Sequence, residues 1–283
     1  MTHQCDNCNS EVSFYSEYCT TCGNFLGFPN VRAADKPKEV EALKKRYENA
    51  IENSLQKDAF ISLFNFEKKV LQSQAVINVN IDYLYTFIKN DKALYSTYCL
   101  QVEGEVRKSA SARDDIERLT IESMIFGDYG KNIRYAALSV DGAGLKSYGA
   151  YTIILKEVAI ENRATLLEDN SYHFIKKHDL QLGNAFPLGY RCTWQKRNQL
   201  AVAKLEEHIT ANTSEKEYVK ILLSGNGKRE TDEFIEVHIY GPFDNKAIAN
   251  VKGKTSFARK DEKAMLAVVK EYLAKAGKTW LEE

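Results

Sequence analysis

Hydrophobic residues recur along this chain with two periods, one typical of helices and one typical of strands. Between residues 40 and 90 the helical spacing predicts amphipathic helices over residues 40–55, 59–74 and 81–90. The same spacing returns later in the chain and predicts helices over residues 111–127, 190–209, 214–225 and 260–277. The part of the chain between the linker and residue 92 is therefore expected to be helical.

Strand patterns appear after residue 92. Aromatic and β-branched residues predict strands in three segments, 94–104, 133–142 and 150–158. The clearest alternation lies in TDEFIEVHIYGPF, residues 231–243, where an apolar set faces one way and a polar set the other: Ile235, Val237 and Ile239 against Glu236, His238 and Tyr240. We assign the apolar set to the core. The order of elements predicts an α+β fold, with helices around a mixed or antiparallel sheet.

Three parts are expected along the chain. Residues 1–28 form a small cysteine-containing module, residues 29–92 a linker with a helical segment, and residues 93–283 the main domain. The linker, GFPNVRAADKPKE at 27–39, holds two of the four prolines of the chain. An Asp and a Pro near its end are typical of the start of a helix.

Four of the six cysteines are paired within the first 22 residues. Cys5, Cys8, Cys19 and Cys22 give the spacing C-x2-C-x10-C-x2-C, in which each C-x2-C turn can present two thiolates to one ion. This spacing predicts a tetrahedral Zn²⁺ site with a structural role, because four protein ligands leave no open position for chemistry. A module of this size needs the metal for its folding energy.

Composition limits the functions that are expected. Lys+Arg and Asp+Glu are both 39, so the chain lacks the basic excess of a protein that coats nucleic acid by charge. No apolar run reaches the ~18–20 residues needed to span a membrane. The first residues, MTHQCDNC, lack the basic and apolar pattern of a signal peptide. We therefore expect a cytoplasmic protein without a membrane partner.

Familiar catalytic motifs are missing from the sequence. It contains no phosphate-loop, dinucleotide-binding, nucleophile-elbow or H-E-x-x-H pattern. Polar residues gather instead at the ends of predicted strands, and these are the candidate site residues: Arg134, Tyr135, Ser139, Ser147, Tyr148, Asn170, Ser171, Glu236 and His238. Any one of them alone is better explained as surface or as a core hydrogen bond.

Three segments together resemble a bacterial, toxin-type ADP-ribosyltransferase-like family. They are IFGDYGKNIRYAALSV (125–140), SYGAYTIILKEVAIENRATLLEDNSYHF (147–174) and FIEVHIYGPFDNKAIANV (234–251). The most specific motif is the Ile-Glu-x-His-x-x-Gly strand, in which His238 stands where the family usually has glutamine. The family's first-strand motif has no clear counterpart, and LQVEG with Gln101 lies where that motif is expected.

The resemblance implies an intracellular enzyme that consumes NAD⁺, such as a toxin or an anti-phage defence factor. Cleavage of the nicotinamide–ribose bond needs a carboxylate near an oxocarbenium-like centre, and Glu236 is the candidate. His238 would orient the substrate or carry a proton. The implied NAD⁺-binding residues are Gln101, Arg134 for the pyrophosphate, Tyr135 or Tyr148 for stacking, Ser139 or Ser147 for the amide, and Ser171.

The acceptor implied by the resemblance is a macromolecule, either RNA, DNA or protein. An antitoxin or chaperone partner is expected from the biology of such toxins. Two alternatives stay open. One is a non-catalytic module in which the zinc site and helices bind a partner or nucleic acid. The other is a different enzyme on a similar sheet, such as an NAD hydrolase or a nuclease.

Overall fold

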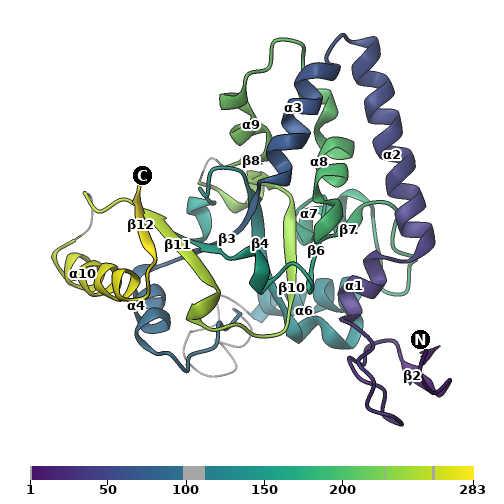
Figure 1. Cartoon of the computed structure of the whole chain (residues 1–283), viewed down its shortest axis with the longest axis horizontal. Coiled ribbons are helices and arrows are strands. Elements are labelled where there is room, and N and C mark those ends of the chain that lie inside the picture. The colour runs from purple at the N-terminus through teal and green to yellow at the C-terminus, as the bar shows by residue number, and fades with distance from the viewer. Residues whose placement is uncertain (1, 98–111, 226, 257–258) are drawn as a thin grey trace.

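The computed structural model describes residues 2–97, 112–225, 227–256 and 259–283. Within them, one mixed sheet of eight strands has the order β12-β11-β5-β3-β4-β10-β6-β7 (Figure 1). The strands are β3 Gln74–Val79, β4 Ile133–Ser139, β5 Tyr151–Leu155, β6 Ala164–Leu167, β7 Arg191–Thr193, β10 Glu236–Tyr240, β11 Ile248–Gly253 and β12 Thr279–Glu282. Neighbouring strands are antiparallel except for the parallel pair β11 and β12. The α+β expectation is confirmed.

Helices cover both faces of this sheet. The first face packs against α2 Pro37–Gln56, α3 Phe60–Leu71, α4 Ile81–Lys89, α8 Arg197–Leu205 and α10 Lys260–Lys275 in one large core. The second face, around β4, β10 and β6, packs against α6 Ala112–Phe126 and α7 Ser171–Lys177. The remaining described helices are α1 Pro29–Ala34 and α9 Glu215–Leu222. β10 is therefore buried between two layers of helices.

The three helices expected before residue 92 are present as α2, α3 and α4. The strands expected at 133–142 and 150–158 are present as β4 and β5. The expectation of an entirely helical segment is wrong at β3, which lies between β4 and β5 in the sheet. The run AVINV is short and mostly apolar, and such a run fits a buried strand as well as a buried helix. Its periodicity therefore cannot distinguish the two.

Two other expectations differ from the structure. Residues 190–209 begin with β7, and the helix α8 starts only at Arg197, because Arg191–Thr193 pair with β6 instead of continuing a helix. Of the expected strand 94–104, residues 98–104 lie outside the described residues, and residues 94–97 form no strand. None of the helices among the described residues is long and apolar enough to cross a bilayer.

The N-terminal cysteine module, residues 1–28, is described from residue 2. It contains the hairpin of β1 Thr2–Gln4 and β2 Glu11–Ser13. The module lies at one end of the molecule beside α1 (Figure 1). Aromatic residues connect it with the second face of the sheet: Tyr15 packs on Tyr129 with ring centres 5.7 Å apart, and Phe28 packs on Tyr240 at 5.5 Å. The module is therefore in contact with the end of β10.

Candidate functional site

The polar face of β10 is buried. Glu236 is 6% exposed and His238 is 3% exposed, while Ile235, Val237 and Ile239 on the other face are fully buried. The expected alternation is therefore confirmed, and both of its halves lie inside the protein. Burial of a carboxylate is costly unless hydrogen bonds compensate it, so the partners of Glu236 decide what it can do.

Three hydrogen-bond donors converge on one oxygen of Glu236. The backbone N–H of Ser171 donates to Oε2 at 3.0 Å, and the Ser171 hydroxyl donates to the same atom. The Nε2 atom of His238 lies 2.9 Å from it. Oε1 accepts no hydrogen bond from the described residues, and the Glu236 side chain is 8% exposed. Among the described residues, one oxygen is thus fixed by hydrogen bonds and the other is not.

The geometry does not suit nucleophilic catalysis by Ser171. In a serine nucleophile triad the histidine uses one ring nitrogen for the serine and the other for the acid. Here Nε2 of His238 faces both groups, at 3.3 Å from the Ser171 hydroxyl and 2.9 Å from Glu236. Because the Ser171 hydroxyl already donates to Glu236, the imidazole holds the carboxylate in place and does not activate the serine.

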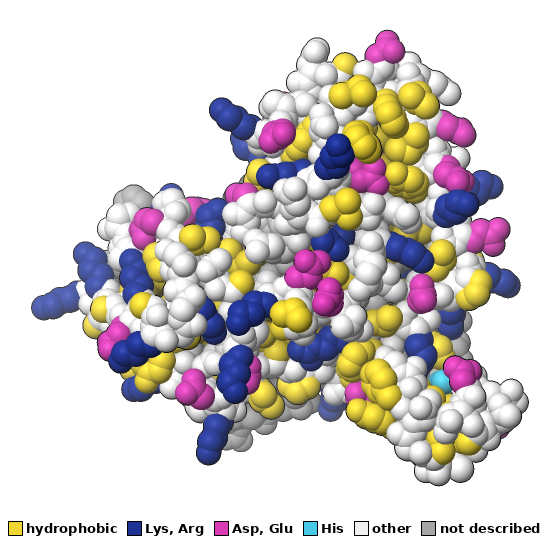
Figure 2. All heavy atoms as spheres, in the orientation of Figure 1, with side chains coloured by type: hydrophobic (Ala, Val, Ile, Leu, Met, Phe, Trp, Pro, Cys, Tyr) yellow, Lys and Arg dark blue, Asp and Glu magenta, His cyan; other side chains and the backbone are white. Residues whose placement is uncertain are grey.

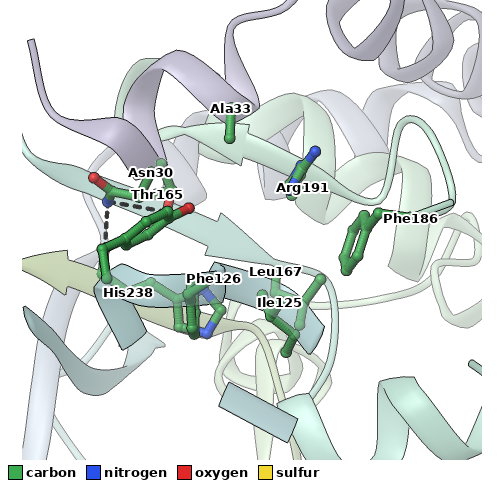
Figure 3. A pocket seen from close by; sticks show the side chains of 10 residues that line it. Asn30, Ala33, Ile125, Phe126, Thr165, Leu167, Phe186, Arg191 and His238 are labelled. Carbon is green, nitrogen blue, oxygen red and sulfur yellow. Dashed lines mark hydrogen bonds between the residues drawn. The ribbon is translucent and has the colours of Figure 1, made fainter. Parts of the chain in front are cut away.

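Aromatic rings enclose His238. Phe126 of α6 meets the imidazole edge to face with ring centres 4.8 Å apart, and Tyr135 of β4 does so at 5.5 Å. Next to them lies a cavity of about 10 Å³, bordered by Asn30, Phe126, Phe186 and His238 (Figure 3). This volume suits one water molecule and is too small for a nicotinamide ring. The His238 side of the pair is therefore closed.

A second group of polar side chains surrounds Tyr148. Tyr148 and Asn170 are half-buried, with the Asn170 amide 3.5 Å from the Tyr148 hydroxyl, and Arg229 lies over the Tyr148 ring at 4.8 Å. Burial raises the pKa of Tyr148 to about 12, and the charge of Glu236 adds to the rise. The positive charge of Arg229 acts on this pKa in the opposite direction.

The structure brings together four of the predicted residues: Ser171, Glu236 and His238 in one network, and Tyr135 against the imidazole. The charge of Glu236 also raises the pKa of Tyr148. Arg134 lies on the opposite face of the sheet, because it pairs with Ile239 in the register of β4 and β10. It cannot meet the same ligand as Glu236 in this arrangement.

The other predicted residues have different places. Ser139 donates to Asp141 at 3.1 Å near the end of β4, and Ser147 donates to the buried Asp232. Both hydroxyls are therefore committed to loop contacts. Gln101 lies outside the described residues.

Some site residues were missed by sequence patterns. Asn30, Phe126 and Arg229 come from α1, α6 and the 3-10 helix η6 Arg229–Thr231 before β9 Glu233–Phe234. Asn30 lies in the predicted linker and Arg229 in a segment rich in Gly and Lys, so neither stands out by motif or periodicity. Phe126 was part of the family resemblance, without a role of its own.

The four cysteines form a compact cluster. Their Sγ atoms all lie within 4.8 Å of one another, with Cys5–Cys22 at 3.7 Å and Cys8–Cys19 at 3.6 Å. Thiolates at ~2.3 Å from a tetrahedral Zn²⁺ lie ~3.8 Å apart, so the spacing fits this ion. The two turns are alike: the Cys5 and Cys19 carbonyls accept from Asn9 and Gly23, at 2.8 and 2.9 Å. The cluster can hold one metal ion with a complete sulfur shell.

Together these features define an α+β protein with a buried Glu–His–Ser network on a central strand and a four-cysteine cluster beside the sheet. Comparison with known proteins adds no family to this description: no protein-family model matches the chain, and no curated protein matches it either.

Proposed function

We propose that the chain is an NAD⁺-consuming ADP-ribosyltransferase with Glu236 as its catalytic carboxylate. The observation that supports this most is the difference in hydrogen bonding between the two oxygens of Glu236. Oε2 is fixed by Ser171 and His238, while Oε1 accepts no hydrogen bond from the described residues. A carboxylate fixed in this way on a central strand is preorganised for a developing positive charge.

In the proposed reaction the bond between ribose C1′ and the nicotinamide nitrogen breaks, and its electron pair leaves with neutral nicotinamide. An oxygen or nitrogen of the acceptor then bonds to C1′, and its proton passes to the surrounding water. Glu236 Oε1 would accept a hydrogen bond from a ribose hydroxyl and stabilise the oxocarbenium-like transition state. His238 and Ser171 would keep the carboxylate in its orientation.

A cation beside Tyr148 suits the pyrophosphate of NAD⁺. Arg229 lies over the Tyr148 ring, whereas Arg134 faces the opposite side of the sheet. Guanidinium groups bind phosphate oxygens through paired hydrogen bonds. We therefore assign the pyrophosphate to Arg229 and the adjoining ring to Tyr148. Entry of nicotinamide beside His238 requires Phe126 to move, since the cavity there is only about 10 Å³.

The cysteine cluster is proposed to hold structural Zn²⁺. Its module is an unfavourable surface for nucleic acid, because residues 1–31 contain no Lys or Arg but three acidic residues, Asp6, Glu11 and Glu17. Four thiolates around Zn²⁺ add two further negative charges. An RNA or DNA acceptor would therefore have to bind elsewhere on the protein.

The test is incubation of the purified protein with adenylate-labelled NAD⁺ and separate pools of RNA, DNA and protein. Label on one pool, lost in Glu236→Gln, supports transfer and names the acceptor class. Free nicotinamide without transfer identifies an NAD hydrolase. No turnover with any pool contradicts an enzymatic function for this site.

A second candidate function, a non-catalytic interaction module, is favoured by one observation. Four large apolar side chains on α2 and α3 are exposed: Leu55, Ile61, Phe64 and Leu71. Figure 2 shows hydrophobic side chains gathered over the part of the molecule where these two helices lie. Contiguous exposed apolar surface is typical of protein contacts. This candidate predicts partner binding that is insensitive to Glu236→Gln.

A further inference from the structure

One arginine connects the cysteine module to helix α1. The Arg32 guanidinium donates to the carbonyl oxygens of Leu26 and Ser16, both at 2.9 Å, and also to those of Gly27 and Phe14. These four acceptors belong to both halves of the module. They come together only when the module is folded, and a module this small depends on its metal to fold. Arg32 therefore links α1 to the folded cysteine module.

Two residues before Arg32, Asn30 enters the seam between β6 and β10. It is 3% exposed, and its Nδ2 donates to Arg163 O at 3.0 Å, His238 O at 3.2 Å and Thr165 Oγ1 at 3.3 Å (Figure 3). The amide orientation follows from these contacts, since all three partners present acceptor oxygens. Asn30 is thus hydrogen-bonded to the backbone of the residue whose ring orients Glu236.

The contacts of Asn30 lie where the pairing between β6 and β10 ends. The pairing of β10 with β6 ends at Ile239 and Ala164, and beyond it Tyr240 N–H donates to Arg163 O at 3.0 Å. Arg163 O therefore accepts from both β10 and Asn30. Loss of the Asn30 donor would leave buried carbonyl groups with fewer partners, at the end of the strand that carries the site.

Gly127, the first residue of the 3-10 helix η1 Gly127–Asn132, also contributes to the docking of the module. A Cβ atom at Gly127 would lie 2.9 Å from the Tyr15 hydroxyl, and the residue has a φ of +59°. Only glycine allows this approach without strain. The contact places Tyr15 of the module on Tyr129, which in turn packs on Tyr240 of β10.

We propose that Asn30 is a positioning residue through which the metal-bound cysteine module sets the geometry of His238 and hence of Glu236. Metal binding is then coupled to the candidate site: loss of metal unfolds the module, releases Arg32 and withdraws the Asn30 amide from the seam. The coupling itself stands on contacts in the structure, while its consequence for catalysis rests on the proposed function.

The experiment compares the full chain with bound metal, the same chain after chelation, and the metal-bound variant Asn30→Asp. This variant keeps the size of the side chain and replaces its donor by an acceptor. Asn24→Asp is the matched control, because Asn24 is an exposed residue of the same module. Hydrogen exchange is followed in peptides covering β6 and β10, with β5 as the internal reference. The metal content of each sample is measured in parallel.

Chelation is expected to speed exchange in β6 and β10 by about tenfold or more and to leave β5 within about twofold. Asn30→Asp should reproduce the change with its metal still bound, and Asn24→Asp should not. The imidazole ¹⁵N signals of His238 should shift in Asn30→Asp, which a general loss of stability would not cause.

Unchanged exchange and imidazole signals in Asn30→Asp would overturn the proposal, and so would unchanged β10 exchange after complete metal removal. These readouts do not depend on NAD⁺. If the coupling is observed but no NAD⁺ is cleaved, the proposed function fails and the role of Asn30 stands. If NAD⁺ is cleaved, Asn30→Asp should lower kcat with little change in KM.

Discussion

Replacement of Glu236 by glutamine removes the negative charge of this side chain and keeps its shape. Three donors, the Ser171 N–H, the Ser171 hydroxyl and His238, converge on Oε2. Glutamine can present its carbonyl oxygen to them in the same place. Its amide then occupies the position of Oε1, where it offers hydrogen atoms to the ribose in place of a negative charge. The network is kept, and the oxygen proposed to act in catalysis is lost.

The structure separates the expected effect on folding from that on turnover. Hydrogen bonds to a charged acceptor become hydrogen bonds to a neutral one, which costs roughly 1–2 kcal/mol and a few degrees in Tm. Removal of one preorganised electrostatic contact from a transition state costs about 10²–10³-fold in rate, or roughly 3–4 kcal/mol. Cleavage of NAD⁺ should therefore fall about 100-fold or more while the protein stays folded.

The assay is release of nicotinamide under saturating NAD⁺, with Tm measured on the same samples. Glu233→Gln is the control, because Glu233 is an exposed carboxylate three residues earlier in the chain. It should keep the wild-type rate within about twofold, as expected for a surface position. The reasoning is refuted if Glu236→Gln turns over NAD⁺ at a rate close to wild type, or if both variants lose activity equally.

Two further predictions concern stability, and a third concerns metal content. The pKa of Tyr148 is about 12 in the folded protein, above the ordinary value near 10. Its contribution to the free energy of unfolding is therefore complete below pH 10 and is lost as the pH rises through 12. Tyr148→Phe should flatten the fall of Tm measured across this alkaline range. Glu39 is fully buried against Arg191, so Glu39→Ala should cost about 3 kcal/mol in urea unfolding while the exposed Glu41→Ala costs almost nothing. Cys5→Ser should abolish the one zinc per chain expected by metal analysis, and a variant that keeps full zinc would contradict the site.

The strand that carries the site could be predicted from sequence because its alternation is local. Ile235, Val237 and Ile239 are buried on one face, and Glu236 and His238 share the other, as the period of two requires. The cysteine cluster could be predicted for the same reason, since its ligands lie within 18 residues of one another. Both features depend on contacts between residues that are close in the chain.

The rest of the site depends on strand order, which periodicity does not encode. β3 was missed because a short apolar run fits a helix or a buried strand equally well. Strand alternation places Arg134 and Tyr135 on opposite faces of the sheet. Only the register of β4 and β10 shows which of the two shares a face with Glu236. Asn30 contacts His238 across 208 residues of chain, and an asparagine in a linker carries no signal of such a contact.

Register also explains why the acid lies at position 236 and the histidine at 238. β6 ends at Leu167, directly opposite Glu236, and the chain then turns to begin α7 at Ser171. The start of α7 therefore comes to lie beside residue 236, where its first N–H and the Ser171 hydroxyl meet a carboxylate. Helix N-termini favour negative charge, so an acid is stable at this point. Two pairs further along, on the same face, His238 lies opposite Thr165, and its Nε2 is 2.9 Å from Glu236. An exchange of the two residues would place the imidazole against the helix N-terminus and the carboxylate against Phe126, which explains why the order cannot be reversed without loss of the network.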